Sequence, residues 1–169
     1  METFDFMKFA AGTNFPTDTV SIYTDADAAY HLEKIESKIA HTLDADELKS
    51  LEAQAEVLRD KFKASEMKIT MRGIPIKREK QYIKDADEKF GKEDTEERRD
   101  WETRSFIAAH IVSVENAEGQ VDKSEWDADK VDTLFNLITL EGITRIKNKA
   151  QELTVRSDIF ENVEVNSDF

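Results

Sequence analysis

Hydrophobic and polar residues alternate over residues 66–72, which predicts a strand with one buried face and one solvent-facing side. The apolar positions of this run are Met67, Ile69 and Met71. Residues 18–23 show the same period, with Val20 and Ile22 on one side and several β-branched neighbours. The two segments therefore predict the first strands of a small sheet.

Between these strands the hydrophobic period changes to the spacing of helices. Thr24 or Asp25 is a suitable N-cap for a first helix that ends near His41, and Asp44 is a suitable N-cap for a second. The apolar seam of the second helix consists of Leu48, Leu51, Ala55, Leu58 and Phe62. Because this seam lasts only about two heptads, we predict a helical hairpin that packs on the sheet rather than an independent coiled coil. The expected contacts of the seam are Val20, Ile22, Ile69 and Met71 on the strands.

A further helix is predicted to start at Pro75, directly after the second strand. Gly73 permits backbone angles that other residues avoid, and the ring of Pro75 presets the first helical turn. The predicted inner face of this helix consists of Ile76, Ile83, Ala86 and Phe90, with Tyr82 beside them. Gly91 is a suitable end for the helix.

The same strand and helix carry a basic island inside an acidic chain. Six lysines and arginines lie between Lys68 and Lys84 against one acid, Glu79, so the segment has a net charge of about +5, whereas the whole chain has a formal charge of -13. Such a contrast predicts a contact with an acidic surface, on a partner or on another copy of the chain. The candidate partner-binding residues of the island are Arg72, Lys77, Arg78 and Lys80, with Tyr82 as their aromatic neighbour.

Residues 92–100 are densely charged, and they predict the solvated start of another helix. This helix contains Trp101, and Asp94 or Thr95 is a suitable cap. Residues 111–114 fit either the end of the helix or a short strand, because periodicity does not separate the two for so brief an apolar run.

The last part of the chain predicts a loop at residues 116–122 and then a helical region. Ser124 or Asp127 opens this region, and Gly142 is expected to bend or split it. The inward positions are Val131, Leu134, Phe135 and Ile138 before Gly142, and Ile143, Ile146, Ala150 and Leu153 after it.

These elements predict a mostly helical α+β fold: a small sheet with a helical hairpin and a C-terminal helical region. A length of 169 residues with 39% hydrophobic content suits one domain with a small core. We divide the chain into a strand, hairpin, strand and basic-helix unit at 1–90, a helical region packed on it at 91–157, and an acidic tail at 158–169.

The two ends are predicted to behave differently. Phe4, Phe6 and Phe9 form an apolar arm that we expect to be ordered, as a strand added to the sheet or in a neighbour's groove. These phenylalanines are further candidate partner-binding residues. Residues 151–169 contain five acids and one arginine, and we expect the tail to be mobile in the free chain or to become ordered on a partner.

Candidate catalytic and metal-binding groups are few. The three histidines lie far apart and lack a second ligand at metal spacing, which is typical of surface or structural histidines. Asp85, Asp87 and Glu96 match three positions of a calcium-loop template, but a helix C-terminus explains them better. The chain has no phosphate-binding glycine loop, nucleophile elbow or zinc signature. We therefore predict no catalytic residue, no metal site and no cofactor, and a protein that is not an enzyme.

Composition narrows the classes of partner. The strong acidic excess argues against binding to free nucleic acid, which requires a large basic face. No apolar run approaches the length of a membrane span or a signal-peptide core. The chain has no cysteine, which is compatible with a reducing cytoplasm. We expect a cytosolic protein that binds neither nucleic acid nor membrane.

Four runs of the chain combine these features in a fixed order. They are SIYTDADAAYHLEKIE, DELKSLEAQAEVLRDKF, KITMRGIPIKREKQYIKD and SFIAAHIVSVENAEGQVDKSEWDADKVDTLFNLI. They comprise an acidic entry from strand to helix, a charged helical hairpin, a strand that leads into a basic helix with Tyr82, and a later helix near Trp126. Over residues 18–140 this order resembles the tail assembly chaperones of long-tailed phages that infect actinobacteria.

The resemblance implies a protein that binds the tape measure protein and keeps it soluble while tail tube subunits polymerise around it. The tail tube protein and a second copy of the chain are further candidate partners. The expected location is the cytoplasm of the bacterial host, and a chaperone is not expected in the finished virion. The alternative is a structural virion protein, such as a head or tail connector, whose neighbours order the apolar arm and the acidic tail.

Overall fold

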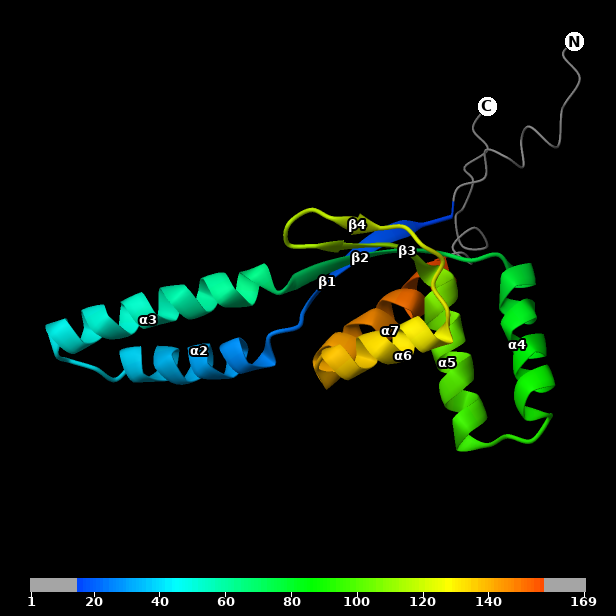
Figure 1. Ribbon diagram of the computed structural model, residues 1–169, viewed down its shortest axis with the longest axis horizontal. Helices are drawn as coiled ribbons and strands as arrows, with labels where there is room; N and C mark the ends of the chain where they lie inside the picture. The colour runs from blue at the N-terminus through cyan, green and yellow to red at the C-terminus, as the bar shows by residue number, and fades with distance from the viewer. Residues whose placement is uncertain (1–14, 157–169) are drawn as a thin grey trace, which may run out of the picture.

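The computed structural model describes residues 15–156, which form six helices and four strands. In chain order the elements are β1 (Thr17–Tyr23), α2 (Ala26–Ile39), α3 (Ala45–Ala64), β2 (Glu66–Arg72), α4 (Ile76–Phe90), α5 (Glu96–His110), β3 (Ile111–Asn116), β4 (Val121–Asp122), α6 (Ala128–Leu137) and α7 (Leu140–Arg156). The predicted class, a mostly helical α+β fold with a small sheet, is confirmed (Figure 1). The predicted apolar arm and acidic tail lie outside the described residues.

The four strands form one antiparallel sheet in the order β1-β2-β3-β4. Val20, Ile69 and Val114 lie side by side across the first three strands, and all three are buried. This register gathers the alternating apolar residues of β1 and β2 on one face, as their period predicts. Helical hairpins connect the strands: α2 and α3 join β1 to β2, and α4 and α5 join β2 to β3. Residue 90 is the boundary between the two predicted units. Strands β1 and β2 precede it and β3 and β4 follow it, so both units contribute to one sheet.

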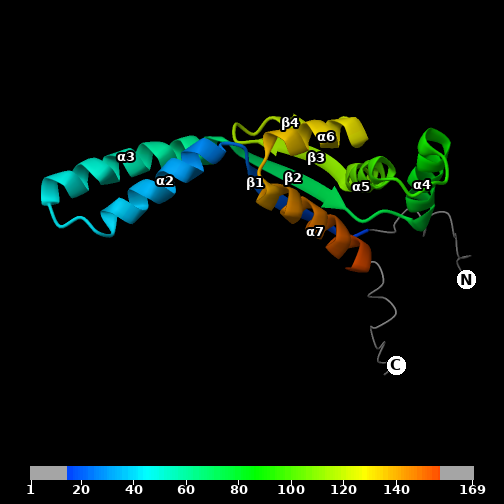
Figure 2. The same ribbon diagram turned by 90° about the horizontal axis from the view of Figure 1, so that it is seen from below.

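The helices α5, α6 and α7 cover the apolar face of the sheet (Figure 2). Their large buried apolar side chains are Ile107, Val131, Leu134, Ile146 and Leu153. An ion pair of 2.6 Å between Lys149 and Asp18 holds α7 beside β1. The opposite face of the sheet carries Thr19 and Thr70, whose hydroxyl oxygens lie 3.3 Å apart. The sheet thus has one apolar face and one polar face, as antiparallel sheets commonly do.

The α2–α3 hairpin does not pack on the sheet, so that prediction was wrong. The two helices extend away from the sheet and contact each other (Figure 1). Leu51 and Ala55 of α3 are buried in this contact, whereas Leu48 and Leu58 are only half-buried. At the root of the hairpin, the ring of Phe62 stacks on Tyr23 with 4.3 Å between centroids.

The physical reason is that other helices occupy the face assigned to the hairpin. The strand residues in question, Val20, Ile22, Ile69 and Met71, belong to the core that α5, α6 and α7 complete. The small side chains of Ala28 and Ala55 are fully buried, so α2 and α3 approach closely and bury their own seam. An ion pair of 2.9 Å between Arg59 and Glu36 also joins the two helices.

Helix ends follow the predicted local chemistry. Four predicted N-cap side chains accept hydrogen bonds from backbone N–H groups two or three residues later. These residues are Asp25, Asp44, Thr95 and Asp127. Pro75 occupies the N-cap of α4, and Gly91 ends that helix with a φ of 75°, which glycine adopts at little cost.

The predicted inner face of helix α4 is confirmed at Ala86 and Phe90, which meets Trp101 of α5, but not at Ile83. Its partner is α5, and the ring of Tyr82 meets Phe106 edge to face at 6.2 Å. Ala86 is fully buried, but Ile83 is 42% exposed and does not belong to the inner face. Because α4 packs on a single helix, one narrow stripe is buried, and Tyr82 takes the place that the period assigned to Ile83.

In the C-terminal half, three further details differ from the prediction or decide between its alternatives. Residues 111–114 form the start of strand β3, directly after α5. The predicted loop at 116–122 contains the β3–β4 turn and the short strand β4. The helical region is split at Ile138 and Thr139, not at Gly142. The hydroxyl oxygen of Thr139 accepts a 3.3 Å hydrogen bond from the N–H of Gly142, so Thr139 acts as the cap of α7.

We expect Ile69→Ala to lower the free energy of unfolding by about 2 to 5 kcal/mol, because this side chain is fully buried in the sheet. Leu58→Ala removes a half-buried side chain from the hairpin and should cost only about 1 kcal/mol. Urea titration of both variants measures the difference. Equal losses would mean that hairpin and sheet share one core, contrary to this fold.

Candidate partner-binding site: a basic cleft at the start of helix α4

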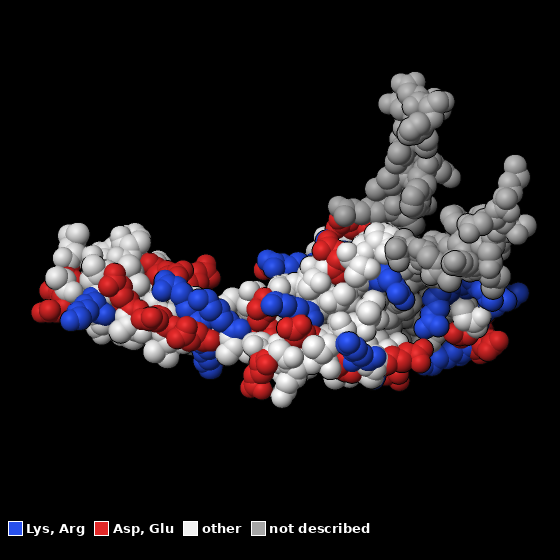
Figure 3. All heavy atoms as spheres, turned by 90° about the horizontal axis from the view of Figure 1, so that it is seen from above, with Lys and Arg blue, Asp and Glu red and all other residues white. Residues whose placement is uncertain are grey.

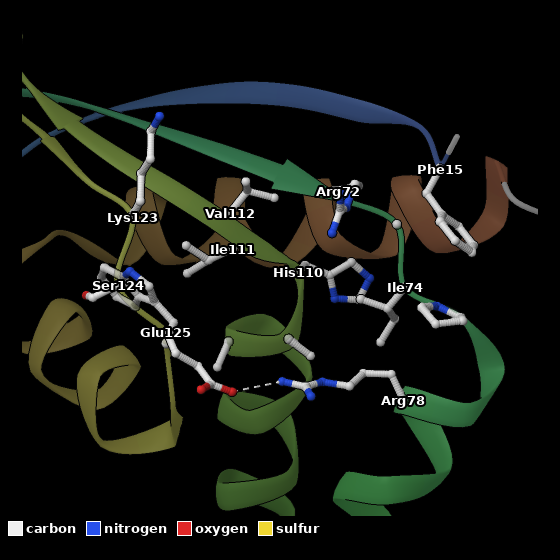
Figure 4. Close-up of a pocket in the computed structure, with 15 residues that line it drawn as sticks. Phe15, Arg72, Ile74, Arg78, His110, Ile111, Val112, Lys123, Ser124 and Glu125 are labelled. Carbon is white, nitrogen blue, oxygen red and sulfur yellow. Dashed lines mark hydrogen bonds and ion pairs between the residues drawn. The ribbon is translucent and has the colours of Figure 1, made fainter. Parts of the chain in front are cut away.

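A cleft of about 510 Å³ lies between the β2–α4 connection, the end of α5 and the loop from β4 to α6 (Figure 4). Its walls come from three segments that are distant in the sequence. The lining includes three basic side chains, Arg72, Arg78 and Lys123, against one acid, Glu125. In a chain of charge -13, the cleft is therefore a locally positive surface.

The first wall is the β2–α4 connection, which close backbone contacts hold in place. The N–H of Gly73 donates a 2.9 Å hydrogen bond to the carbonyl oxygen of Pro16. A Cβ atom on Gly73 would lie 3.3 Å from both the carbonyl oxygen of Leu153 and the Cδ of Pro16. A side chain at this position would therefore require its neighbours to shift by a few tenths of an ångström. Arg72 and Ile74, on either side of Gly73, line the cleft.

The second wall is the loop from β4 to α6, which several hydrogen bonds fix. Asp122 accepts a 2.8 Å bond from the N–H of Ser124, and hydrogen bonds from Ser124 lower the pKa of this carboxyl. The Nζ of Lys130 donates to Ser124 Oγ at 3.0 Å and to the carbonyl oxygen of Glu125 at 2.5 Å. The indole Nε1 of Trp126 is buried and has no acceptor among the described residues. This wall thus contains a donor that the described chain leaves unsatisfied.

The floor of the cleft is the end of α5. Ala108 and Ala109 have small side chains, which leave room for the hollow. The next residue, His110, is fully buried. Its Nδ1 lies 2.7 Å from the carbonyl oxygen of Phe106, and its Nε2 lies 3.1 Å from Thr154 Oγ1. Because a carbonyl only accepts, Nδ1 carries the hydrogen in the neutral ring. The hydroxyl of Thr154 also lies 3.0 Å from the carbonyl oxygen of Ala150, so its one hydrogen is shared between that oxygen and Nε2.

One exposed ion pair crosses the cleft. Arg78 and Glu125 point toward each other, 3.4 Å apart, as Figure 4 shows. Beyond them lies a second hollow of about 280 Å³, lined by Tyr82, Trp101 and Trp126. Both partners are largely exposed, and such ion pairs contribute little to stability. Arg78 can therefore exchange Glu125 for another carboxylate, at a position that borders both hollows.

The structure divides the predicted partner-binding residues into groups. Arg72 and Arg78 line the cleft, and Tyr82 lines the adjoining hollow. Lys77 and Lys80 are exposed, and because successive helical residues lie about 100° apart, they leave α4 on a different side from Arg78. Phe4, Phe6 and Phe9 lie outside the described residues. The basic island is therefore two surfaces rather than one.

Sequence reasoning missed the residues that the second wall contributes, Lys123 and Glu125 above all. They reach the cleft because β4 pairs with β3, and a strand of two residues leaves no readable period. The run from Lys123 to Trp126 combines a base, an acid and an aromatic residue between a strand and a helix. That combination in a short loop was the available signal for a binding segment.

Asp87, one of the acids of the calcium-loop template, has a structural partner. Arg98 pairs with Asp87 at 2.6 Å and with Glu102 at 2.8 Å, which fastens the α4–α5 turn. These hydrogen bonds, that to Glu102 first, raise the pKa of Arg98. Asp87 of the calcium-loop template is thus engaged by an arginine. Among residues 15–156, no cluster of three or more His, Asp or Glu side chains is placed to hold a metal ion.

Within the same residues, no helix is both long and apolar enough to cross a lipid bilayer. Comparison with known proteins finds no matching family model, no significantly similar curated protein and no significantly similar solved structure.

Burial lowers the pKa of His110 below its ordinary value of 6.5, although the hydrogen bond to Phe106 and the charge of Glu79 act in the opposite direction. The unfolded chain therefore gains a proton near pH 6.5 that the folded chain does not bind. The stability that neutral His110 supports is complete above that pH and falls as the pH drops toward the folded pKa.

We expect the melting temperature of the wild-type chain to decrease as the pH is lowered from about 7 to 5.5. His110→Gln should remove part of this dependence of stability on pH. The slope reaches at most about 1.4 kcal/mol per pH unit for one proton. The matched control is His41→Gln, which makes the same substitution at an exposed histidine. If His110→Gln shows the wild-type slope, neutral His110 is not the cause of the pH dependence.

Proposed function

We propose that this chain is a tail assembly chaperone of a long-tailed phage. In this function it is not an enzyme; it binds the tape measure protein in the cytoplasm of the bacterial host and is released before the virion is complete. The supporting observation is the basic cleft, because it lies where the strand leads into the basic helix in the sequence pattern of residues 18–140.

The chemistry of the cleft suits an acidic segment that also carries apolar side chains. Guanidinium groups such as those of Arg72 and Arg78 bind carboxylates with two parallel hydrogen bonds. Ile74 and Val112 supply apolar lining, and Val112 is 39% exposed. A positive site on an acidic protein also directs an acidic segment to one place, because the rest of the surface repels it.

The projecting hairpin supports a role in handling a long helical partner. Three of its large apolar side chains, Tyr30, Leu43 and Val57, are 53%, 101% and 68% exposed. Figure 3 shows lysine, arginine and acidic side chains interleaved along the same hairpin. Isolated apolar side chains among mixed charges suit reversible contacts with an amphipathic helix. The acidic surface keeps such a complex dispersed.

The same hairpin favours a second candidate, a structural virion protein such as a head or tail connector. In a ring of subunits, a neighbour would cover Leu43 and Val57, which are exposed in the single chain. Mass spectrometry of purified particles separates the two functions. A chaperone is absent from the particles, whereas a connector is present in a fixed copy number.

We expect the double variant Arg72→Glu with Lys123→Glu to bind a soluble fragment of the tape measure protein about tenfold more weakly than wild type. Neither residue forms an ion pair with another described residue, so the reversal should leave the fold intact. Isothermal titration calorimetry at two salt concentrations measures the affinity. The wild-type affinity should fall with added salt, because salt screens charges near the surface.

The control variant is Lys77→Glu with Lys80→Glu, which makes the same change of charge on the outer side of α4. It should bind as wild type does. If the control weakens binding as much as the cleft variant, the outer side of α4 is the binding surface. If wild type does not bind the fragment at all, the proposed function is wrong.

A further inference from the structure

The last turn of α7 lies against the basic cleft. Thr154 Oγ1 is 3.1 Å from the Nε2 of His110, and His110 lines the cleft. The carbonyl oxygen of Leu153 closely approaches Gly73 in the opposite wall. Figure 2 shows this end of α7 beside the connection from β2 to α4. The described structure therefore ends next to the cleft, at Arg156.

The residues that follow have the chemistry that the cleft selects. Residues 157–169, SDIFENVEVNSDF, contain four acids and no base. The acids are Asp158, Glu161, Glu164 and Asp168. Between them stand Ile159, Phe160, Val163 and Val165, so acidic and apolar side chains are interleaved. The cleft offers Arg72, Arg78 and Lys123 together with apolar lining.

We propose that residues 157–169 of this chain dock in its own basic cleft and compete there with the partner. The competition rests on the proposed function, which supplies the partner. The docking itself does not depend on that function. The cleft is small, with a volume of about 510 Å³. An extended chain advances about 3.3 Å per residue, so a few residues after Arg156 are enough to cross it.

The N-terminal segment is the weaker candidate for the same place. It also leaves beside the cleft, because Phe15 is one of the lining residues. Residues 1–14, however, carry Glu2 and Asp5 against Lys8, so their charges nearly cancel. Charge complementarity with Arg72 and Lys123 therefore favours the C-terminal segment.

Attachment to the same chain makes even a weak contact effective. A short flexible linker gives an effective concentration of about 1 mM. A segment that binds with a dissociation constant of about 0.1 mM would thus occupy the cleft about ten times as often as it leaves it open. Free partner then meets a site that is open about one tenth of the time, and its apparent affinity falls about tenfold.

Such docking is compatible with rapid hydrogen exchange in the acidic tail. A tenfold occupancy slows exchange by only about tenfold, far less than in a buried core. The sequence predicts a mobile tail, and a tail that docks only transiently is still mobile. The two statements are therefore compatible. The cleft supplies a place to dock that residues 157–169 alone do not reveal.

The absence of cysteine from the whole chain permits a direct test with a single spin label. The full chain with Ser167→Cys is labelled, and broadening of amide NMR signals is measured at Ile74, Val112 and Lys123. The reference chain carries the same label with Asp158→Asn, Glu161→Gln, Glu164→Gln and Asp168→Asn. We expect stronger broadening at the cleft in the acidic chain than in the neutralised one.

The cleft variants supply the matched controls. Arg72→Glu with Lys123→Glu should lower the broadening to the level of the neutralised chain, and Lys77→Glu with Lys80→Glu should leave it unchanged. Equal broadening in the acidic and neutralised chains would overturn the proposal. Labelled unenriched chain mixed with unlabelled nitrogen-15 chain detects docking between copies. Broadening of comparable strength in that mixture would overturn docking within one chain in favour of a second copy.

A synthetic peptide of residues 157–169 gives the functional readout. Fluorescence anisotropy should show that the neutralised full chain binds this peptide about tenfold more tightly than wild type, because its own segment no longer competes. Equal affinities would contradict self-competition even if the tape measure protein binds. Failure of both chains to bind the tape measure protein, with the peptide result intact, would instead remove the proposed function and leave self-docking in place.

Discussion

The structure depends on burial of one face of a small sheet, and strand β2 is at the centre of that burial. Ile69 and Met71 are fully buried, and β2 pairs with both β1 and β3. Each connection of β2 to a neighbouring strand is a helical hairpin, so each hairpin must return the chain to the sheet in register. The end of β2 is consequently a fixed point, and Arg72, Gly73 and Ile74 leave it as one wall of the cleft.

The cleft combines segments that only this sheet brings together. The pairing of β3 with β4 brings the loop of Lys123 and Glu125 to the cleft. Helix α5 leads directly into β3, so Ala109 and His110 at its end form the floor of the cleft. The β2–α4 segment supplies two of the three bases, Arg72 and Arg78, and the loop after β4 adds Lys123. The assembly of these segments concentrates three bases against one acid within a chain of strongly negative charge. An electrostatic contrast of this kind affects where a partner binds more than how the chain folds.

Local sequence patterns predicted local structure well. The strands at β1 and β2, the two hairpin helices and four N-cap residues agree with their periods and side-chain chemistry. What the hairpin packs against was not predictable, because an apolar seam shows that a face is buried without showing its partner. Leu58 illustrates this limit: its spacing fits packing on the sheet and packing on α2 equally. Arg78 illustrates the same limit for the site. Its charge and its angle from Lys77 and Lys80 on a helix were evident, but which of these sides faces the cleft depends on the orientation of α4.

The outward direction of the α2–α3 hairpin makes its length independent of the rest of the fold. Its tip, at residues 40–44, lies far from the sheet in Figure 1. Adding seven residues to each helix would carry the tip about 10 Å farther and keep the same seam. The strands that the hairpin joins would keep their register, because its root would not change. Evolution or protein engineering can thus adjust the reach of this protein without redesigning its core.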